Sequence, residues 1–162
     1  MSKKRAFYGG ITVLLMLFML FPSRIIFVNV TASLPPGIYV RIPNTTLRQG
    51  DYVGYQPTDE VRDFSLEHGW MPGDQYLFLK KAALPGTFYQ IGERFYIEGE
   101  DRGPVFKTSP SGVQLPDKHG IFVVPEGQFL PYGTNDYSFD GRYEGTVPME
   151  NIVARVIPIW IF

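Results

Sequence analysis

The stretch YLFLKKAALPG, residues 76–86, places four apolar residues before two adjacent lysines and ends in Leu-Pro-Gly. A short apolar run that closes on Pro-Gly is typical of a β-strand followed by a tight turn. Successive side chains of a strand point to opposite faces, so Lys80 and Lys81 must lie on different sides of it. Although both lysines of such a pair are usually solvated, the apolar residues on either side favour burial of one of them.

Other short runs of the chain share this character. They are rich in Val, Ile, Tyr and Phe and are bounded by Gly, Pro, Asn or Asp: GIYVRI, DYVGY, RFYIEG, GIFVVP and NIVARVIPIWIF. This pattern predicts strands joined by tight turns. Residues 59–69, DEVRDFSLEHG, are the exception and predict a short helix that ends at Gly69. We find no internal repeat or linker, and we therefore predict one mainly β domain.

The last run, IVARVIPIWIF over residues 152–162, allows two interpretations. Pro158 cannot donate a hydrogen bond to a neighbouring strand, so we expect a core strand at the edge of a sheet. Alternatively, this run forms a surface that touches a bilayer, with Trp160 near the lipid headgroups.

Composition excludes several classes of function. The formal net charge is −1, which leaves no general footprint for nucleic acid, and we expect no nucleic-acid partner. The chain has no cysteine, which excludes disulfides, a thiol nucleophile and cysteine-bound zinc. His68 and His119 are its only histidines, so a histidine metal cluster is not expected. We predict neither a metal site nor a small-molecule cofactor.

The N-terminus indicates a membrane segment. Three cations, in MSKKR, precede the apolar run of residues 6–21. As a helix this run would span about 24 Å, and continuation through residues 25–30 would make it long enough to cross a bilayer. We predict an anchor over residues 1–28, with its N-terminus inside, and an extracytoplasmic domain over residues 29–162. A cleavable signal peptide that ends near Ala32 is the alternative, and it places the rest of the chain on the same side.

A nucleophile can be sought directly after this segment, in TASLPPGIYV, residues 31–40. A simple turn that redirects the chain is one interpretation of SLPPG, and a turn that presents Ser33 for chemistry is the other. A serine hydroxyl is inert near neutral pH unless a base removes its proton. With few histidines, the obvious base is a lysine whose pKa has been lowered by burial. The lysine pair at residues 80 and 81 supplies the candidates.

Three blocks, in this order, resemble the signal peptidase I superfamily, which uses a serine-lysine dyad. They are SLPPGIY at residues 33–39, LKKAALPG at residues 79–86 and YGTNDYSFDGRYEGTVP at residues 132–148. The third block is similar to the last box of that superfamily, GDNRDNSxDSR, although it is one residue shorter and has Thr134 in place of the first aspartate. Leu34 stands where ordinary signal peptidases typically have methionine. The chain therefore resembles most closely the TraF-type peptidases of conjugative elements.

The resemblance implies a signal-peptidase-like domain of antiparallel β-sheet with an N-terminal transmembrane helix. It also implies a role for individual residues. Ser33 would be the nucleophile and Lys80 the general base, while Thr31 would support the oxyanion and Ser138 would orient the lysine. One residue is missing between the lysine pair and Pro-Gly, so Lys81 is the alternative base.

Asp140 and Arg142 complete the implied site. They are two residues apart, so in a strand they would share a face and could form an ion pair. We interpret this pair as a structural brace behind the site.

The function that the resemblance implies is a membrane-anchored serine endopeptidase that matures a pilin precursor for conjugative transfer. Its partners would be the membrane and a pilin precursor or another membrane-inserted preprotein. Its location would be the bacterial inner membrane, in a single pass, with the catalytic domain in the periplasm or outside. Two alternatives stay open: a general signal peptidase that removes secretory leaders, and a catalytically inactive, anchored β-domain of a secretion assembly.

Overall fold

The computed structural model describes residues 25–43 and 46–162. Most of the anchor expected over residues 1–28 therefore lies outside the described residues. The part that is described begins with strand β1 (Ile26–Asn29), so the expected boundary after residue 28 falls inside a strand. Within the described ranges, no helix is sufficiently long and apolar to cross a bilayer.

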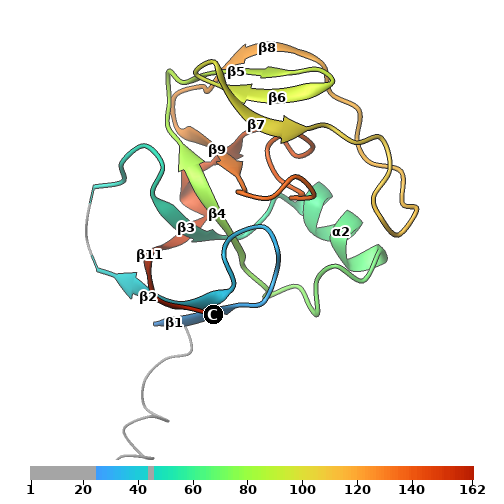
Figure 1. The fold of residues 1–162 in the computed structure, drawn as a ribbon. Coiled ribbons are helices and arrows are strands. Elements are labelled where there is room, and N and C mark those ends of the chain that lie inside the picture. The colour runs from blue at the N-terminus through green and yellow to red at the C-terminus, as the bar shows by residue number, and fades with distance from the viewer. Residues whose placement is uncertain (1–24, 44–45) are drawn as a thin grey trace, which may run out of the picture.

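The larger of two sheets carries both ends of the described chain. Its seven strands all pair antiparallel. In spatial order they are β1, β2 (Gly37–Ile42), β11 (Ile152–Ile161), β3 (Tyr52–Tyr55), β4 (Phe78–Ala83), β9 (Gln128–Tyr132) and β10 (Val147–Pro148). Figure 1 shows β1, β2 and β11 side by side at the bottom of the molecule, where the chain enters the domain.

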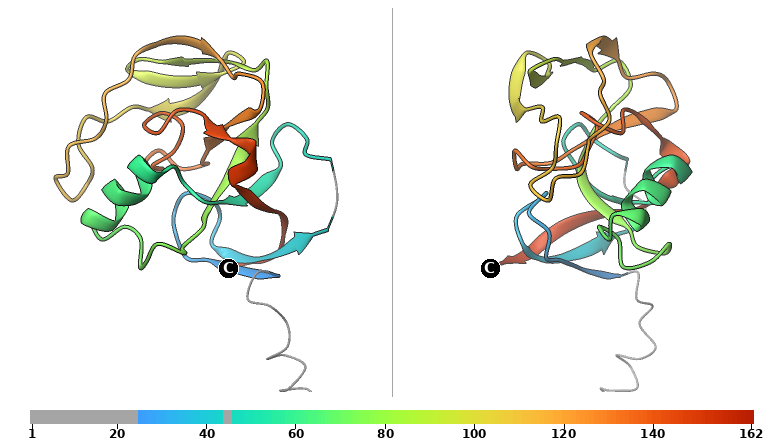
Figure 2. Two further views of the ribbon diagram at one scale, coloured as in Figure 1. Left: turned by 180° about the vertical axis from the view of Figure 1, so that it is seen from behind. Right: turned by 90° about the vertical axis from the view of Figure 1, so that its right-hand side faces the viewer.

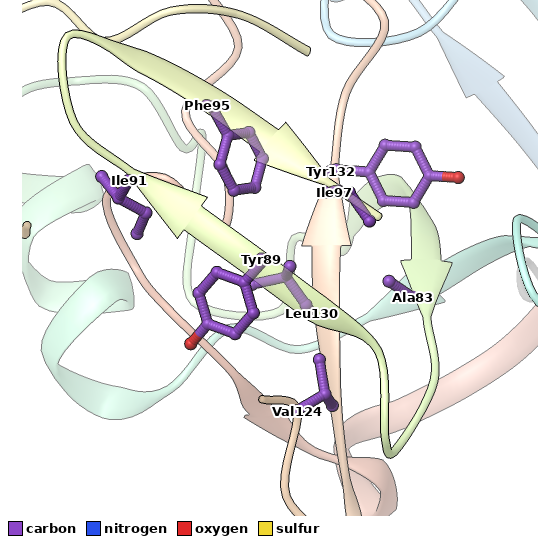
Figure 3. Close-up of a cluster of buried hydrophobic side chains, with 8 residues drawn as sticks. All are labelled: Ala83, Tyr89, Ile91, Phe95, Ile97, Val124, Leu130 and Tyr132. Carbon is purple, nitrogen blue, oxygen red and sulfur yellow. The ribbon is translucent and has the colours of Figure 1, made fainter. Parts of the chain in front are cut away.

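A second sheet forms the top of the molecule in Figure 1. It has four strands, in the order β7 (Glu100–Pro104), β6 (Arg94–Ile97), β5 (Phe88–Ile91) and β8 (Gly120–Val123). A buried cluster connects the two sheets, as the close-up in Figure 3 shows. Tyr89, Ile91, Phe95 and Ile97 come from the small sheet and pack with Ala83, Leu130 and Tyr132 of the large sheet and with Val124.

The predicted helix is present as α2 (Asp59–Glu67), and a single 3-10 turn, η1 (Met149–Asn151), precedes β11. Helix α2 begins with Asp59 and Glu60 in its first turn, where carboxylates interact favourably with the helix dipole. Gly69 follows the helix with φ +68°, a conformation that glycine adopts without strain. The two views of Figure 2 show this helix on the side of the large sheet, clear of the small sheet.

The prediction of an edge position for the last strand is wrong. β11 lies between β2 and β3, inside the large sheet. Pro158 is tolerated there because β3 pairs with β11 only as far as Val156, and beyond that point β2 is the only partner among the described strands. Ala154 and Val156 are buried, whereas the side chains from Ile157 onward are exposed.

Candidate active site

The side chains of the two adjacent lysines project from opposite faces of strand β4. Lys80 is 4% exposed, and Lys81 on the opposite face is partly exposed. The Lys81 ammonium lies 5.4 Å from the centre of the Tyr52 ring, where it keeps access to solvent. Lys80 is therefore the lysine of the pair that loses its hydration.

Burial changes the proton affinity of Lys80. Its Nζ donates a hydrogen bond of 3.0 Å to Ser138 Oγ. Desolvation is the largest influence and lowers the pKa of Lys80 to about 8, while the nearby acids Asp140 and Glu144 oppose this decrease. A substantial fraction of this lysine is thus neutral at mildly alkaline pH, which a general base requires.

Ser33 lies in the turn that connects β1 to β2, and the side chain of Asn29 organises this turn. Asn29 is buried, and its Nδ2 donates hydrogen bonds to the carbonyl oxygens of Thr31, at 3.1 Å, and Leu34, at 2.9 Å. Its Oδ1 accepts hydrogen bonds from the backbone N–H of Thr31 and from the Thr31 hydroxyl. One amide side chain therefore holds the backbone on both sides of Ser33.

Gly133 brings the serine turn against Ser138. The backbone N–H of Thr134 donates to the Ser33 carbonyl oxygen at 2.8 Å. A methyl group on Gly133 would lie 2.7 Å from this same oxygen and would overlap the side chain of Ser138. Only a residue without a side chain fits at this position, and it links Ser33 to the partner of Lys80.

Ser33 and Lys80 line a common cavity of about 360 Å³. Thr31 and Asn29 border the same space. Most of the remaining wall is aromatic or aliphatic, and it includes Trp70, Phe106, Leu115, Tyr137, Phe139 and Tyr143. The arrangement combines a hydroxyl, a buried amine and an apolar wall that can receive part of a peptide.

The pair expected as a brace lies beside this cavity. Arg142 Nε donates to Asp140 Oδ1 at 2.9 Å, and both side chains are fully buried. Arg142 also donates to three carbonyl oxygens, those of Arg102, Pro104 and Asp136, and Asp140 Oδ2 accepts the N–H of Gly133. The pair does not lie on a strand. Asp140 begins a tight turn in which its carbonyl accepts the N–H groups of Tyr143 and Glu144.

Sequence reasoning did not find Glu144. Its Oε1 accepts a hydrogen bond of 2.5 Å from the Tyr55 hydroxyl, and its Oε2 is buried. Burial raises the pKa of this carboxyl to about 8. No sequence signal could have indicated this residue, because it lies in an irregular turn and its partner is 89 residues away in the chain.

Helix α2 covers the turn that carries Ser138 and Asp140. Phe64 of the helix stacks on Phe139, and Phe139 stacks on Tyr143, with ring centres 5.6 and 5.5 Å apart. The two histidines take no part in the contacts around Lys80. His68 ends helix α2 and lies against Phe64, whereas His119 pairs with Asp117 in a loop.

The described part of the chain contains no group of three or more His, Asp or Glu side chains that could hold a metal ion.

Comparison with known proteins assigns the family. The model for signal peptidase, peptidase S26, matches residues 3–161. The plasmid transfer protein TraF of Escherichia coli is 30% identical over 145 residues, which cover 82% of this chain and 81% of that protein. Signal peptidase I of Leptolyngbya laminosa is 31% identical over 118 residues, which cover 70% of this chain and about half, 53%, of that protein. The chain belongs to the signal peptidase family, peptidase S26.

A solved structure of a signal peptidase I from Enterococcus faecalis also aligns with this chain. It covers 70% of this chain and 98% of its own, with 16% identity and a TM-score of 0.42.

Proposed function

We propose that this protein is a membrane-anchored serine endopeptidase that matures a pilin precursor, with Ser33 as nucleophile and Lys80 as general base. The observation that carries the proposal is the buried Lys80 amine, held by Ser138 at 3.0 Å, in a cavity that Ser33 also lines. Membership of the peptidase family supports the reaction class. The similarity to the plasmid transfer protein TraF, which extends over most of both chains, supports a role in conjugative transfer. Pilin as the substrate follows from the resemblance of the sequence motifs to the TraF-type peptidases.

In the proposed reaction, neutral Lys80 removes the proton of the Ser33 hydroxyl while Oγ forms a bond to the scissile carbonyl carbon. The tetrahedral intermediate collapses, the C–N bond breaks, and the Lys80 ammonium returns the proton to the leaving amine. Water then hydrolyses the acyl-enzyme, or an amine attacks it if the product is cyclic. The hydrogen bond to Ser138 keeps Lys80 in one orientation through both proton transfers.

The oxyanion would be stabilised by the N–H of Ser33, and a donor of this kind typically contributes about 3 kcal/mol. The hydroxyl of Thr31 now donates to Asn29 Oδ1 at 2.8 Å. To act on the oxyanion, this hydroxyl must rotate away from Asn29 when substrate binds.

A general signal peptidase is the second candidate, and the similarity to signal peptidase I of Leptolyngbya laminosa favours it. The two candidates share their chemistry and differ in substrate. Purified full-length protein in detergent, offered a TraF-system pilin precursor and a secretory preprotein in parallel, separates them. We expect faster cleavage of the pilin precursor, and equal or reversed rates would favour the general peptidase.

Active-site variants test the proposed chemistry. They also distinguish a peptidase from the alternative of a catalytically inactive, anchored β-domain. Ser33→Ala and Lys80→Ala should abolish cleavage of the pilin precursor. Lys81→Ala, on the other face of β4, is the matched control and should keep it. Normal cleavage by Ser33→Ala would refute the proposal, and loss of cleavage in Lys81→Ala alone would move the base to Lys81.

A further inference from the structure

We propose that Glu144 is a positioning residue that raises the proton affinity of Lys80 when its carboxyl ionises, without touching the substrate. The inference rests on the proposed Ser33–Lys80 chemistry. It identifies a group that, together with burial and Asp140, determines at which pH this base becomes available.

The pairing of β3 with β4 places Lys80 and the partner of Glu144 on one face of the large sheet. Val53 lies opposite Lys80, and Tyr55 lies opposite Phe78. Opposite residues share a face, as do residues two apart, so all four side chains point the same way. The Phe78 ring connects the two sites, since its centre is 5.8 Å from Lys80 Nζ and 5.9 Å from the centre of the Tyr55 ring.

The carboxyl group of Glu144 reaches the same face from the turn that follows Asp140. The Tyr55 hydroxyl donates to its Oε1 at 2.5 Å. Its Oε2 is buried and has no hydrogen-bond partner among the described residues. A buried carboxyl oxygen without a partner is costly to keep ionised, so a functional reason for it is worth seeking.

The other charged groups nearby are already paired. Asp140 and Arg142 act on Lys80 with opposite sign and form an ion pair with each other. Lys118 also acts on Glu144, but its Nζ donates to the backbone carbonyl of Glu144 and not to the carboxyl. Glu144 is thus an acid near Lys80 whose carboxyl group has no hydrogen-bonded cation among the described residues. Burial raises its pKa to about 8, so it becomes charged in the pH range in which Lys80 titrates.

The direction of the effect follows from the charges. An ionised Glu144 stabilises the Lys80 ammonium, so it raises the pKa of Lys80 above the value that burial alone would give. Loss of this charge leaves Lys80 neutral at lower pH. The same loss makes Lys80 a weaker base, because the ammonium formed during the attack by Ser33 is less stabilised.

Titration of Lys80 by carbon-13 NMR, in full-length protein labelled at lysine Cε, measures this effect without relying on cleavage. A Lys80→Arg spectrum assigns the signal. For Glu144→Gln we expect the pKa of Lys80 to fall by about one unit, a tenfold change in proton affinity. Tyr55→Phe should give a smaller fall, because the carboxyl loses the donor that favours its ionised form. Glu150→Gln, which removes an exposed carboxylate from the same region, should leave Lys80 unchanged.

The pH dependence of pilin-precursor cleavage gives a second readout. In Glu144→Gln, the rise of kcat/KM with pH should occur at lower pH, because Lys80 becomes neutral earlier. The maximal kcat/KM should be lower, because Lys80 is a weaker base. A Lys80 titration that is the same in Glu144→Gln and the unmodified protein would overturn the inference, whether or not the protein cleaves pilin. A shifted titration in a protein that cleaves no precursor would uphold the coupling and refute the proposed function. If Glu144→Gln does not fold, an unchanged Lys80 titration in Tyr55→Phe would overturn the inference.

Discussion

At the residue scale, burial of the Lys80 amine lowers the stability of the fold while it prepares this side chain for the proposed chemistry. The strand that carries it would be more stable with an apolar side chain at this position, because folding removes water from an amine. The hydrogen bond to Ser138 offsets part of this cost. The arrangement is reasonable only if the protein uses a neutral amine, which is the role that we propose.

The first prediction concerns Lys80→Met. Burial lowers the pKa of Lys80 from 10.5 to about 8, so protonation destabilises the folded state by about 3 kcal/mol at pH 7. Lys80→Met removes this destabilisation, but it also loses the hydrogen bond to Ser138, which costs about 1 kcal/mol of stability. We therefore expect Lys80→Met to raise the free energy of unfolding by about 2 kcal/mol, as measured by urea denaturation at pH 7.

The sign of this gain depends on pH. The folded-state pKa lies below the unfolded one, so the cost is fully present below pH 8 and disappears as the pH rises above 10.5. The gain from Lys80→Met should shrink over the same range and become a loss of about 1 kcal/mol above pH 10.5, where only the missing hydrogen bond to Ser138 counts. Lys81→Met, on the exposed face of β4, should show no such dependence. A Lys80→Met variant that is less stable at pH 7 would contradict the account of burial.

At the scale of elements, the site is assembled from three segments that do not adjoin in sequence. The turn after β1 carries Ser33, β4 carries Lys80, and the loop after β9 carries Gly133 and Ser138. Their junction is the contact of Gly133 with Ser33 and Ser138, and Asp140 fixes Gly133 by accepting its N–H at 2.8 Å. The brace and the nucleophile are thus joined through one glycine.

The second prediction follows for Gly133→Ala. The added methyl group would overlap Ser138 and press on the Ser33 carbonyl, so either the serine turn or the partner of Lys80 must move. Overpacking of this kind typically costs about 1–3 kcal/mol. We expect cleavage to fall at least about tenfold, because displacement of reacting groups by about an ångström has larger effects on rate than on stability. Rates at saturating substrate and urea denaturation measure the two effects.

Gly92→Ala is the matched control for this prediction, since a methyl group at Gly92 meets no atom within 4 Å. It should retain both rate and stability. Full activity in a folded Gly133→Ala protein would show that the junction does not position the site.

Prediction from sequence was most successful for elements with strong local patterns. GIYVRI coincides with β2, and the helix over residues 59–69 is present as α2. β5, β7 and β9 were missed, because their short sequences alternate weakly or contain Gly and Pro. The central position of β11 could not be foreseen, since the residues that pair with it lie about one hundred positions away.

The candidate site was partly predictable for a similar reason. Motif resemblance indicated Ser33, Lys80, Ser138, Asp140 and Arg142, all of which the structure places around or beside one cavity. Glu144 and the buried role of Asn29 depend on contacts between distant segments or on the shape of a turn. No pattern of residue types predicts such contacts.

At the scale of the whole molecule, the described domain begins within the last residues of the anchor predicted over residues 1–28. The bottom of the domain in Figure 1 carries β1 and the end of β11, with exposed apolar side chains on both. They include Ile26, Val28, Ile159, Trp160 and Phe162. The serine turn follows β1 directly, so an anchor would hold the site close to a bilayer.

The third prediction compares two truncations. A chain that begins at residue 25 keeps β1 and Asn29, and we expect it to fold and to be released by carbonate extraction, whereas the full chain remains with the membrane. A chain that begins at residue 31 lacks β1 and the side chain that organises the serine turn, so its unfolding midpoint in urea should be lower. If both the full chain and the chain from residue 25 resist carbonate extraction, residues 1–24 are not the anchor.

The central claim is that neutral Lys80 activates Ser33, and the rate of acylation of Ser33 tests it most directly. Rapid quenching with a pilin-derived peptide ester, followed by intact mass and peptide mapping, measures this rate between pH 5 and 10. We predict that acylation occurs at Ser33, rises about tenfold per pH unit at low pH, and levels off near the pKa of Lys80, about 8. It should be lost in Lys80→Met and retained in Lys81→Met. Acylation at another residue, or an unchanged rate in Lys80→Met, would contradict the account.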